Sequence, residues 1–228
     1  MIYYLGIFLI YCFPTLWAKY TFSKYDEVLK NMPFTGLDFG NTILKEKGLN
    51  EVTIQGKKNI ADHYNLDTKT VVVELERLER KSLTSITVIC HEIGHAIQHK
   101  EQYKPLMQKH TTISVTKWIS KLGSLVFYIG IPTIIATQSF PFIRICLLIA
   151  FISVLINIVI HLFTLNVEFD ASFQRAMPIL QNKIPSQYHK TCKTILRVCA
   201  FTYVIGAMTS FLNIRNIWIL LRMILFRR

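Results

Sequence analysis

The sequence predicts an α+β fold class in the form of a multi-pass helical membrane protein, carrying one small polar domain built on a long helix and a short sheet. Two observations lead to this prediction. The chain of 228 residues is 51% hydrophobic and only 18% charged, which is too apolar for an ordinary soluble domain. Long apolar runs also alternate with two polar regions, residues 19–117 and 166–196, so membrane spans and polar domain separate along the chain.

The apolar runs are candidate membrane spans. Residues 1–18 contain no charged side chain and no small-residue cleavage site, which indicates a retained N-terminal membrane anchor. Residues 118–165 hold two runs that match the thickness of a hydrocarbon core, which predicts a transmembrane hairpin that turns near Pro141. Residues 197–228 start apolar and end rich in arginine, so we expect a transmembrane or interfacial C-terminal helix. Three or four spans are compatible with these runs.

The distribution of charge predicts the orientation in the cell membrane. Lys19, Lys24 and Lys30 closely follow the N-terminal anchor, and basic residues in short loops mark the cytoplasmic side. We therefore expect residues 19–117 in the cytoplasm, and the hairpin returns residues 166–196 to the same side. The net charge of +12 comes with no nucleic-acid-binding motif, so the expected partner is the lipid bilayer and not nucleic acid.

The polar domain is predicted to begin with a helix and a small sheet. Thr35 precedes a helical stretch, which Gly48 ends in the left-handed conformation that glycine tolerates. Two runs rich in β-branched residues, 51–55 and 70–75, predict strands. We expect a hairpin through residues 60–64, because turn-forming residues separate this segment from the second run.

A long helix follows, and it carries the sequence HEIGH at residues 91–95. Ser82 is a suitable N-cap, and the apolar residues that follow recur at helical spacing. Within a helix His91 and His95 share one face, where both can bind a single Zn²⁺ ion. Glu92 adjoins the first ligand and is the expected general base for a zinc-activated water. A chance match is the alternative, but the capped amphipathic helix and adjacent sheet favour a true zinc site.

A catalytic zinc ion needs a third protein ligand. The pattern HExxHxxGxxH is absent, because position 101 is Glu101. After Glu101 the acidic residues are Glu168 and Asp170, just behind the predicted hairpin. In an α-helix these two side chains point about 200° apart, so only one of them can bind the ion. Three other donors compete for this role: His110, Asn157 and His161.

Three segments together resemble a known family: HEIGHAIQH at residues 91–99, DHY at 62–64 and VEFDAS at 167–172. They resemble the YugP-like neutral zinc metallopeptidases, and the likeness extends over nearly the whole chain. This resemblance implies a membrane zinc protease with a gluzincin-like domain.

A more distant similarity to HtpX-like membrane proteases bears on the third ligand. In those proteins a downstream glutamate completes the zinc site, which implies Glu168 rather than Asp170. Their pattern has an aspartate four residues further on, where this sequence has Ser172. Asp170 is then a candidate outer partner of the site, and His63 in the DHY segment is a candidate donor to the oxyanion.

The sequence therefore predicts a membrane-embedded zinc metalloendopeptidase with its active site on the cytoplasmic side. Its expected substrates are membrane-associated proteins or peptides. The alternative is a noncatalytic zinc-stabilised membrane scaffold or partner-binding protein. The sequence does not indicate cleavage specificity or oligomeric state.

Overall fold

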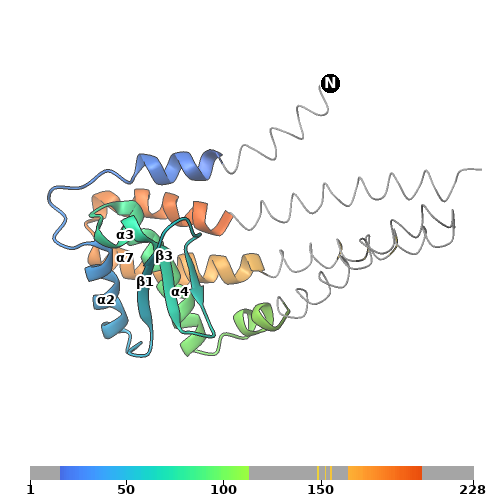
Figure 1. The fold of residues 1–228 in the computed structure, drawn as a ribbon. Coiled ribbons are helices and arrows are strands. Elements are labelled where there is room, and N and C mark those ends of the chain that lie inside the picture. The colour runs from blue at the N-terminus through green and yellow to red at the C-terminus, as the bar shows by residue number, and fades with distance from the viewer. Residues whose placement is uncertain (1–15, 113–147, 149–151, 153–154, 156–163, 202–228) are drawn as a thin grey trace, which may run out of the picture. The chain divides into compact units, whose positions relative to one another are not determined.

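The computed structural model describes residues 16–112, 148, 152, 155 and 164–201 (Figure 1). Contacts divide the chain into two compact units, Met1–Leu106 with Leu165–Thr202, and Met107–Thr164 with Tyr203–Arg228. Nearly all described residues belong to the first unit, which is an α+β domain. It also contains helical residues 16–24, 165–169 and 189–201, and a further helix covers residues 104–112.

Helix α2, Gly36–Glu46, opens the core of this domain. Thr35 and Asp38 form a capping box: the Thr35 hydroxyl accepts from the Asp38 N–H, and the Asp38 carboxylate accepts from the Thr35 N–H. These bonds satisfy two of the N–H groups that a helix leaves unpaired at its start. Gly48 follows the helix with φ of 62°, so the predicted helix and its glycine end are confirmed.

The sheet has three strands in the order β1–β3–β2. These are β1, Thr53–Lys57, β2, His63–Asn65, and β3, Thr70–Glu74, so the two strand predictions are confirmed within three residues. β2 and β3 form the predicted antiparallel hairpin, whereas β1 runs parallel to β3. β3 is buried at its first four residues, as its run of valines suits a central strand. Helix α3, Leu75–Glu79, follows it directly.

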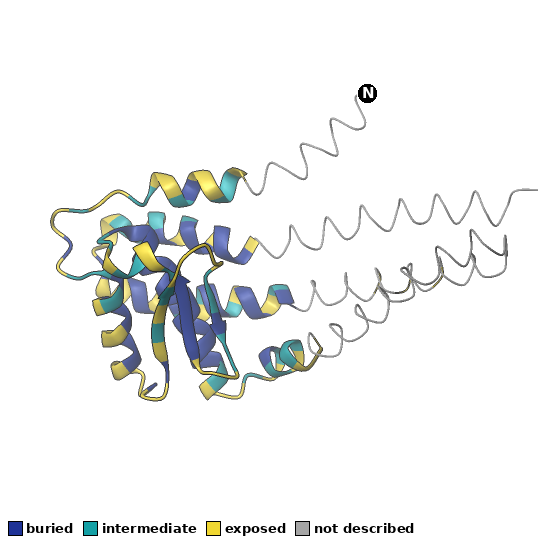
Figure 2. Ribbon diagram, in the orientation of Figure 1, coloured by how far each residue is buried: buried dark blue, intermediate teal, exposed yellow. Residues whose placement is uncertain are grey.

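Helix α4, Leu83–Lys100, lies at the centre of the domain. The Ser82 hydroxyl accepts from the Ser85 N–H, which confirms the predicted N-cap. Every residue from Leu83 to Gln98 is buried, so the helix that was predicted to be amphipathic has no solvent-facing side over this stretch (Figure 2). The helix packs against α2, the sheet and the segment after residue 164, and these cover it on several sides. Polar side chains of α4 must therefore find partners inside the protein.

The segment after residue 164 supplies the closest neighbour of α4. Its helix continues as the π-helix η1, Asp170–Ala176, and then as α7, Met177–Lys183. Pro178 lies at the start of α7 inside this continuous helix, where it has no N–H to donate to the preceding turn. The 3₁₀-helix η2, Ser186–Tyr188, leads into the last described helix.

Gly94 is the point at which α4 and η1 approach each other. A Cβ atom added to Gly94 would lie 2.6 Å from the carbonyl oxygen of Ala171. Only a residue without a side chain permits this backbone contact.

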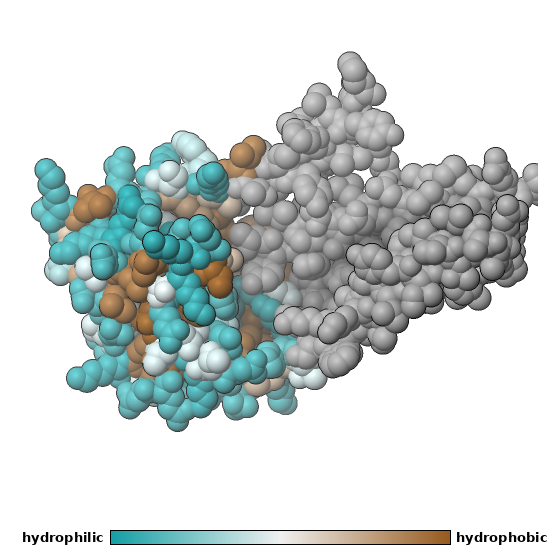
Figure 3. Space-filling view, viewed as in Figure 1, coloured by the Kyte–Doolittle hydropathy of each residue, from teal (hydrophilic) through white to brown (hydrophobic). Residues whose placement is uncertain are grey.

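The prediction of a multi-pass helical membrane protein is wrong as far as the structure describes the chain. Among the described residues no helix is both long enough and apolar enough to cross a bilayer. α4 reaches 18 residues, but its polar side chains belong to the core of the α+β domain. On the face seen in Figure 3 the surface of this domain is largely hydrophilic.

The predicted spans lie almost entirely outside the described residues. This holds for residues 1–18, 118–165 and 197–228, of which the structure describes only a few positions. The division of the chain at these boundaries stays a prediction.

Candidate metal centre

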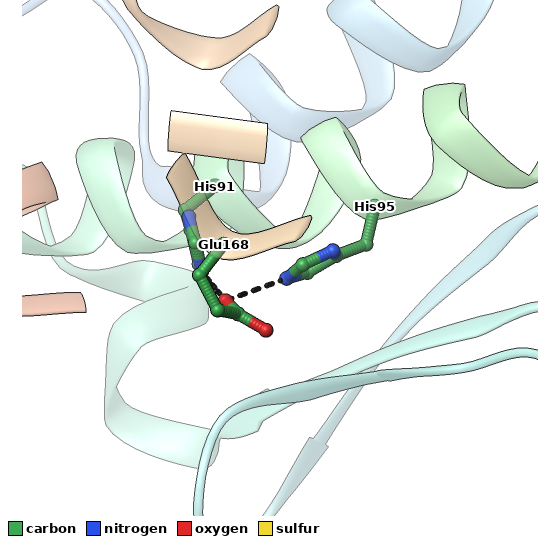
Figure 4. A group of neighbouring side chains, drawn as sticks. All are labelled: His91, His95 and Glu168. Carbon is green, nitrogen blue, oxygen red and sulfur yellow. Dashed lines mark hydrogen bonds and ion pairs between the residues drawn. The ribbon is translucent and has the colours of Figure 1, made fainter. Parts of the chain in front are cut away.

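Three potential metal ligands meet in the core of the domain (Figure 4). Oε2 of Glu168 lies 3.3 Å from Nε2 of His91 and 3.1 Å from Nε2 of His95. One ligand atom from each residue can be chosen so that all three lie within 4.8 Å of one another. All three side chains are buried, and Glu168 is 0% exposed.

Local structure explains why these residues meet. His91 and His95 are one turn apart on α4 and so project from the same face. Glu168 comes 73 residues after His95 and reaches that face because η1 crosses α4 at Gly94. Ala171, which touches Gly94, is one turn further along the chain than Glu168. The close backbone contact therefore places the carboxylate within reach of both imidazoles.

The donor set fits zinc. Two imidazole nitrogens and one carboxylate oxygen make the three-ligand set that catalytic zinc sites use, with a further position left for water or substrate. The second ring nitrogen of each histidine is engaged, since Nδ1 of His95 lies 2.9 Å from Oε1 of Gln98 and Nδ1 of His91 lies 3.1 Å from Oγ of Ser172. Such outer hydrogen bonds usually accompany histidines that bind metal.

Glu92 follows the first histidine on α4 and is 6% exposed. Glu92 does not belong to the group of three ligands. Its role as general base stays a prediction.

The two acidic residues of the VEFDAS segment have different hydrogen-bond and ion-pair partners. Glu168 reaches the histidines, whereas Oδ2 of Asp170 accepts from Nε2 of Gln98 at 2.7 Å and from Nε of Arg175 at 3.1 Å. Only Glu168 belongs to the group of three ligands, and Asp170 has other partners among the described residues. The α-helical segment ends at Phe169, and the π-helix η1 begins at Asp170.

His63 and its neighbour lie outside the group of three ligands. Nδ1 of His63 donates to the Ala61 carbonyl at 2.8 Å. Asp62 accepts from the Glu74 N–H at 2.8 Å and from Nε of Arg77 at 3.1 Å. Asp62 therefore fastens the end of β3 to the strand before it, and the oxyanion role of His63 stays a prediction.

Two functional candidates were not found by sequence reasoning, namely Gln98 and Ser172 as partners of the histidines. Gln98 lies three residues after His95, which places it on the same side of the helix. Ser172 is the residue at which the sequence departs from the HtpX-like pattern. Of the competing ligands, His110 is not part of the group, and Asn157 and His161 lie outside the described residues.

Two histidines on one helix and a glutamate from a later segment form the His₂Glu donor set used by catalytic zinc sites. The chain belongs to the family described as "Putative neutral zinc metallopeptidase", whose model matches residues 1–223. It is 29% identical over 203 residues to "Putative membrane protease YugP" of Bacillus subtilis (strain 168), covering 86% of each chain. No solved structure matches. The resemblance to YugP-like zinc metallopeptidases is thus confirmed.

Proposed function

We propose that this protein is a zinc-dependent endopeptidase with one Zn²⁺ ion held by His91, His95 and Glu168. The observation that carries the proposal is the convergence of three ligand atoms within 4.8 Å in the core of the domain. Membership of a family of neutral zinc metallopeptidases supports the same metal and the same class of reaction.

In this proposal Glu92 is the general base. When bound, Zn²⁺ would supply Lewis acidity, which polarises a peptide carbonyl and makes a nearby water more acidic. Glu92 takes the proton from that water as it attacks the carbonyl carbon, and then delivers a proton to the departing amine. Glu92 directly follows His91 on α4 and is 6% exposed, which supports this role.

We further propose that the protein acts at a membrane, on membrane-associated proteins or peptides. The support is the name of the relative from Bacillus subtilis, which calls it a membrane protease. Fractionation of cells that express the full chain tests this proposal. Recovery in the membrane fraction after a high-salt wash supports it, and recovery in the supernatant contradicts it.

Replacement of Glu92 by glutamine tests the catalytic assignment. Glu92→Gln preserves size and hydrogen bonding but cannot accept the proton, so cleavage of casein should fall by about 10²–10⁴-fold. Zinc content, measured by elemental analysis of the same sample, should equal that of the wild type. Glu76→Gln is the matched control, because Glu76 has a side chain that is 80% exposed on α3.

The same samples distinguish the noncatalytic alternative. Full activity in Glu92→Gln would refute the general-base role. Wild-type protein that holds zinc but cleaves neither casein nor membrane-protein substrates would instead favour a zinc-stabilised scaffold.

A further inference from the structure

Gln98 is a buried polar residue of α4 whose amide orientation the structure determines. Its side chain is 0% exposed. Nε2 lies 2.9 Å from the Val167 carbonyl oxygen and 2.7 Å from Oδ2 of Asp170. A backbone carbonyl and a carboxylate paired with Arg175 are both acceptors, so the group facing them must be the NH₂. The other end of the amide, Oε1, is therefore the oxygen.

This orientation fixes the protonation of His95. Oε1 of Gln98 can only accept, and it lies 2.9 Å from Nδ1 of His95. Nδ1 must therefore carry the hydrogen, and in the neutral ring Nε2 then holds the lone pair. That lone pair is the one that lies 3.1 Å from the Glu168 carboxylate.

Ser172 on η1 has the same relation to the other histidine. Its hydroxyl, which is fully buried, donates to the Leu196 carbonyl at 3.4 Å. Oγ is then the acceptor for Nδ1 of His91 at 3.1 Å. His91 also presents the lone pair of Nε2 toward Glu168, at 3.3 Å.

We propose that Gln98 and Ser172 are the positioning residues of the metal centre. Each holds one histidine in the tautomer and the ring orientation that a metal ion requires, so the ligand atoms are arranged before the ion binds. The inference rests on the proposed function, because it takes the three ligands as a zinc site.

The two positioning residues share a chemical property that deepens the proposal. An amide and a hydroxyl are neutral acceptors, whereas a carboxylate in the same place would add negative charge beside the ligands. Two neutral imidazole ligands and the Glu168 carboxylate give the ligand set a charge of −1. The ion therefore keeps part of its positive charge at the site, which favours polarisation of a substrate carbonyl.

Asp170 acts on His95 indirectly, through Gln98. It accepts from Gln98 and from Arg175, so it holds the amide in the orientation that His95 needs. Arg175 in turn forms an ion pair with Glu101 at the end of α4. These contacts join η1 to the C-terminal end of α4.

A comparison of Gln98 with Gln102, which lies just after the end of α4, tests the proposal. Gln98→Met retains length and volume but removes the acceptor, so the dissociation constant for zinc, measured by chelator competition, should rise about 10–100-fold. Gln102→Met is the matched control, because Gln102 is exposed and its amide donates to the His99 carbonyl. The visible absorption of the Co²⁺-loaded protein should change in Gln98→Met and stay as in the wild type in the control.

A second pair of variants keeps the test decisive where Gln98→Met fails to fold. Ser172→Ala removes the acceptor of His91, and Ser186→Ala removes an exposed hydroxyl in η2. Zinc affinity should fall about 10–100-fold in the first variant and stay unchanged in the second. Wild-type zinc affinity and Co²⁺ spectrum in a folded Gln98→Met or Ser172→Ala protein would overturn the proposal.

These readouts separate this inference from the proposed function. If the wild type binds zinc but cleaves nothing, a fall in affinity in both variants still supports the positioning roles and the endopeptidase proposal fails. If the wild type cleaves casein while both variants bind zinc as tightly as it does, the positioning roles fail and the endopeptidase proposal stands.

Discussion

At the scale of single residues, two carboxylates two positions apart have different surroundings and should have different effects on the metal. Glu168 contacts both histidines, whereas Asp170 contacts Gln98 and Arg175. Glu168→Ala removes one of three ligands, so zinc content by elemental analysis should fall from about one ion per chain to near zero, with loss of casein cleavage. Asp170→Ala is the matched control and should retain the ion at saturating zinc, with weaker affinity. Retention of zinc by Glu168→Ala would remove it from the ligand set.

The residues of the site differ in how far the sequence could predict them. His91 and His95 follow from helical spacing alone, since four residues make about one turn. For the third ligand, the residues alone left Glu168, Asp170 and three other donors, because the contact depends on a crossing of two distant segments. The choice of Glu168 came from the similarity to HtpX-like proteases. The roles of Gln98 and Ser172 depend on the same crossing, and each is an ordinary polar residue in the sequence. No local pattern encodes such long-range hydrogen bonds.

At the scale of secondary-structure elements, the crossing of α4 and η1 depends on Gly94. Alanine would raise helix propensity by about 1 kcal/mol. Its Cβ would, however, lie 2.6 Å from a backbone oxygen of Ala171, and such overpacking costs about 1–3 kcal/mol. Since a backbone cannot rotate away as a side chain can, we expect Gly94→Ala to lower the free energy of unfolding in urea and to weaken zinc binding at least 10-fold.

A second glycine provides the control for this prediction. A Cβ atom on Gly56 in β1 would meet the side-chain ends of Leu75 and Leu78, at 2.7 Å each. Gly56→Ala should therefore also reduce stability, but it should leave zinc affinity as in the wild type. Equal zinc affinity in Gly94→Ala and the wild type would show that the crossing tolerates a side chain.

Tyr64 in strand β2 contacts His99 in helix α4. Because burial raises the pKa of Tyr64, we expect the stability of the folded protein to depend on pH in the alkaline range. The hydroxyl of Tyr64 lies 2.9 Å from Nδ1 of His99. Burial, with a smaller contribution from the negative charge of Glu51, raises the pKa of Tyr64 from 10.0 to about 12. The folded protein thus favours the protonated phenol, and this stabilisation is complete below pH 10 and is lost as pH rises through about 12.

The measurement is an absorbance titration at alkaline pH of the wild type and of Tyr64→Phe. The difference between the two titration curves should have its midpoint near pH 12. Because Tyr64→Phe also loses the hydrogen bond to His99, its free energy of unfolding at neutral pH should fall by about 0.5–1.5 kcal/mol. A midpoint near pH 10 would mean that Tyr64 is solvated.

Among the elements, those with local signals were predictable. The cap at Ser82, the glycine after α2 and the turn between β2 and β3 each involve neighbouring residues. The parallel pairing of β1 with β3 and the π-helix η1 were not predicted. Parallel pairing depends on the connection between distant strands, and a π-helix differs from an α-helix by one extra residue in a turn, which periodicity over a short window does not resolve.

At the scale of the whole chain, the apolar composition led to a wrong expectation for the described part. Hydrophobic residues there form the core around α4 and β3, and polar residues of α4 are buried among them. Composition averages over the chain and so does not distinguish a buried helix from a membrane span. The order of segments was more informative, because it pointed to Glu168, a candidate metal ligand 73 residues after His95.

That separation in sequence predicts that zinc stabilises the whole domain. The ion would join α4 to the segment after residue 164, and only the folded chain brings these ligands together. Zinc at about 1,000 times its dissociation constant should add about 4 kcal/mol to the free energy of unfolding. For a chain of this size the melting temperature should then rise by about 8–16 °C, and EDTA should reverse the change. The control is His95→Ala, whose melting temperature should respond to neither zinc nor EDTA, and an equal rise in that variant would mean that zinc stabilises the fold from another place.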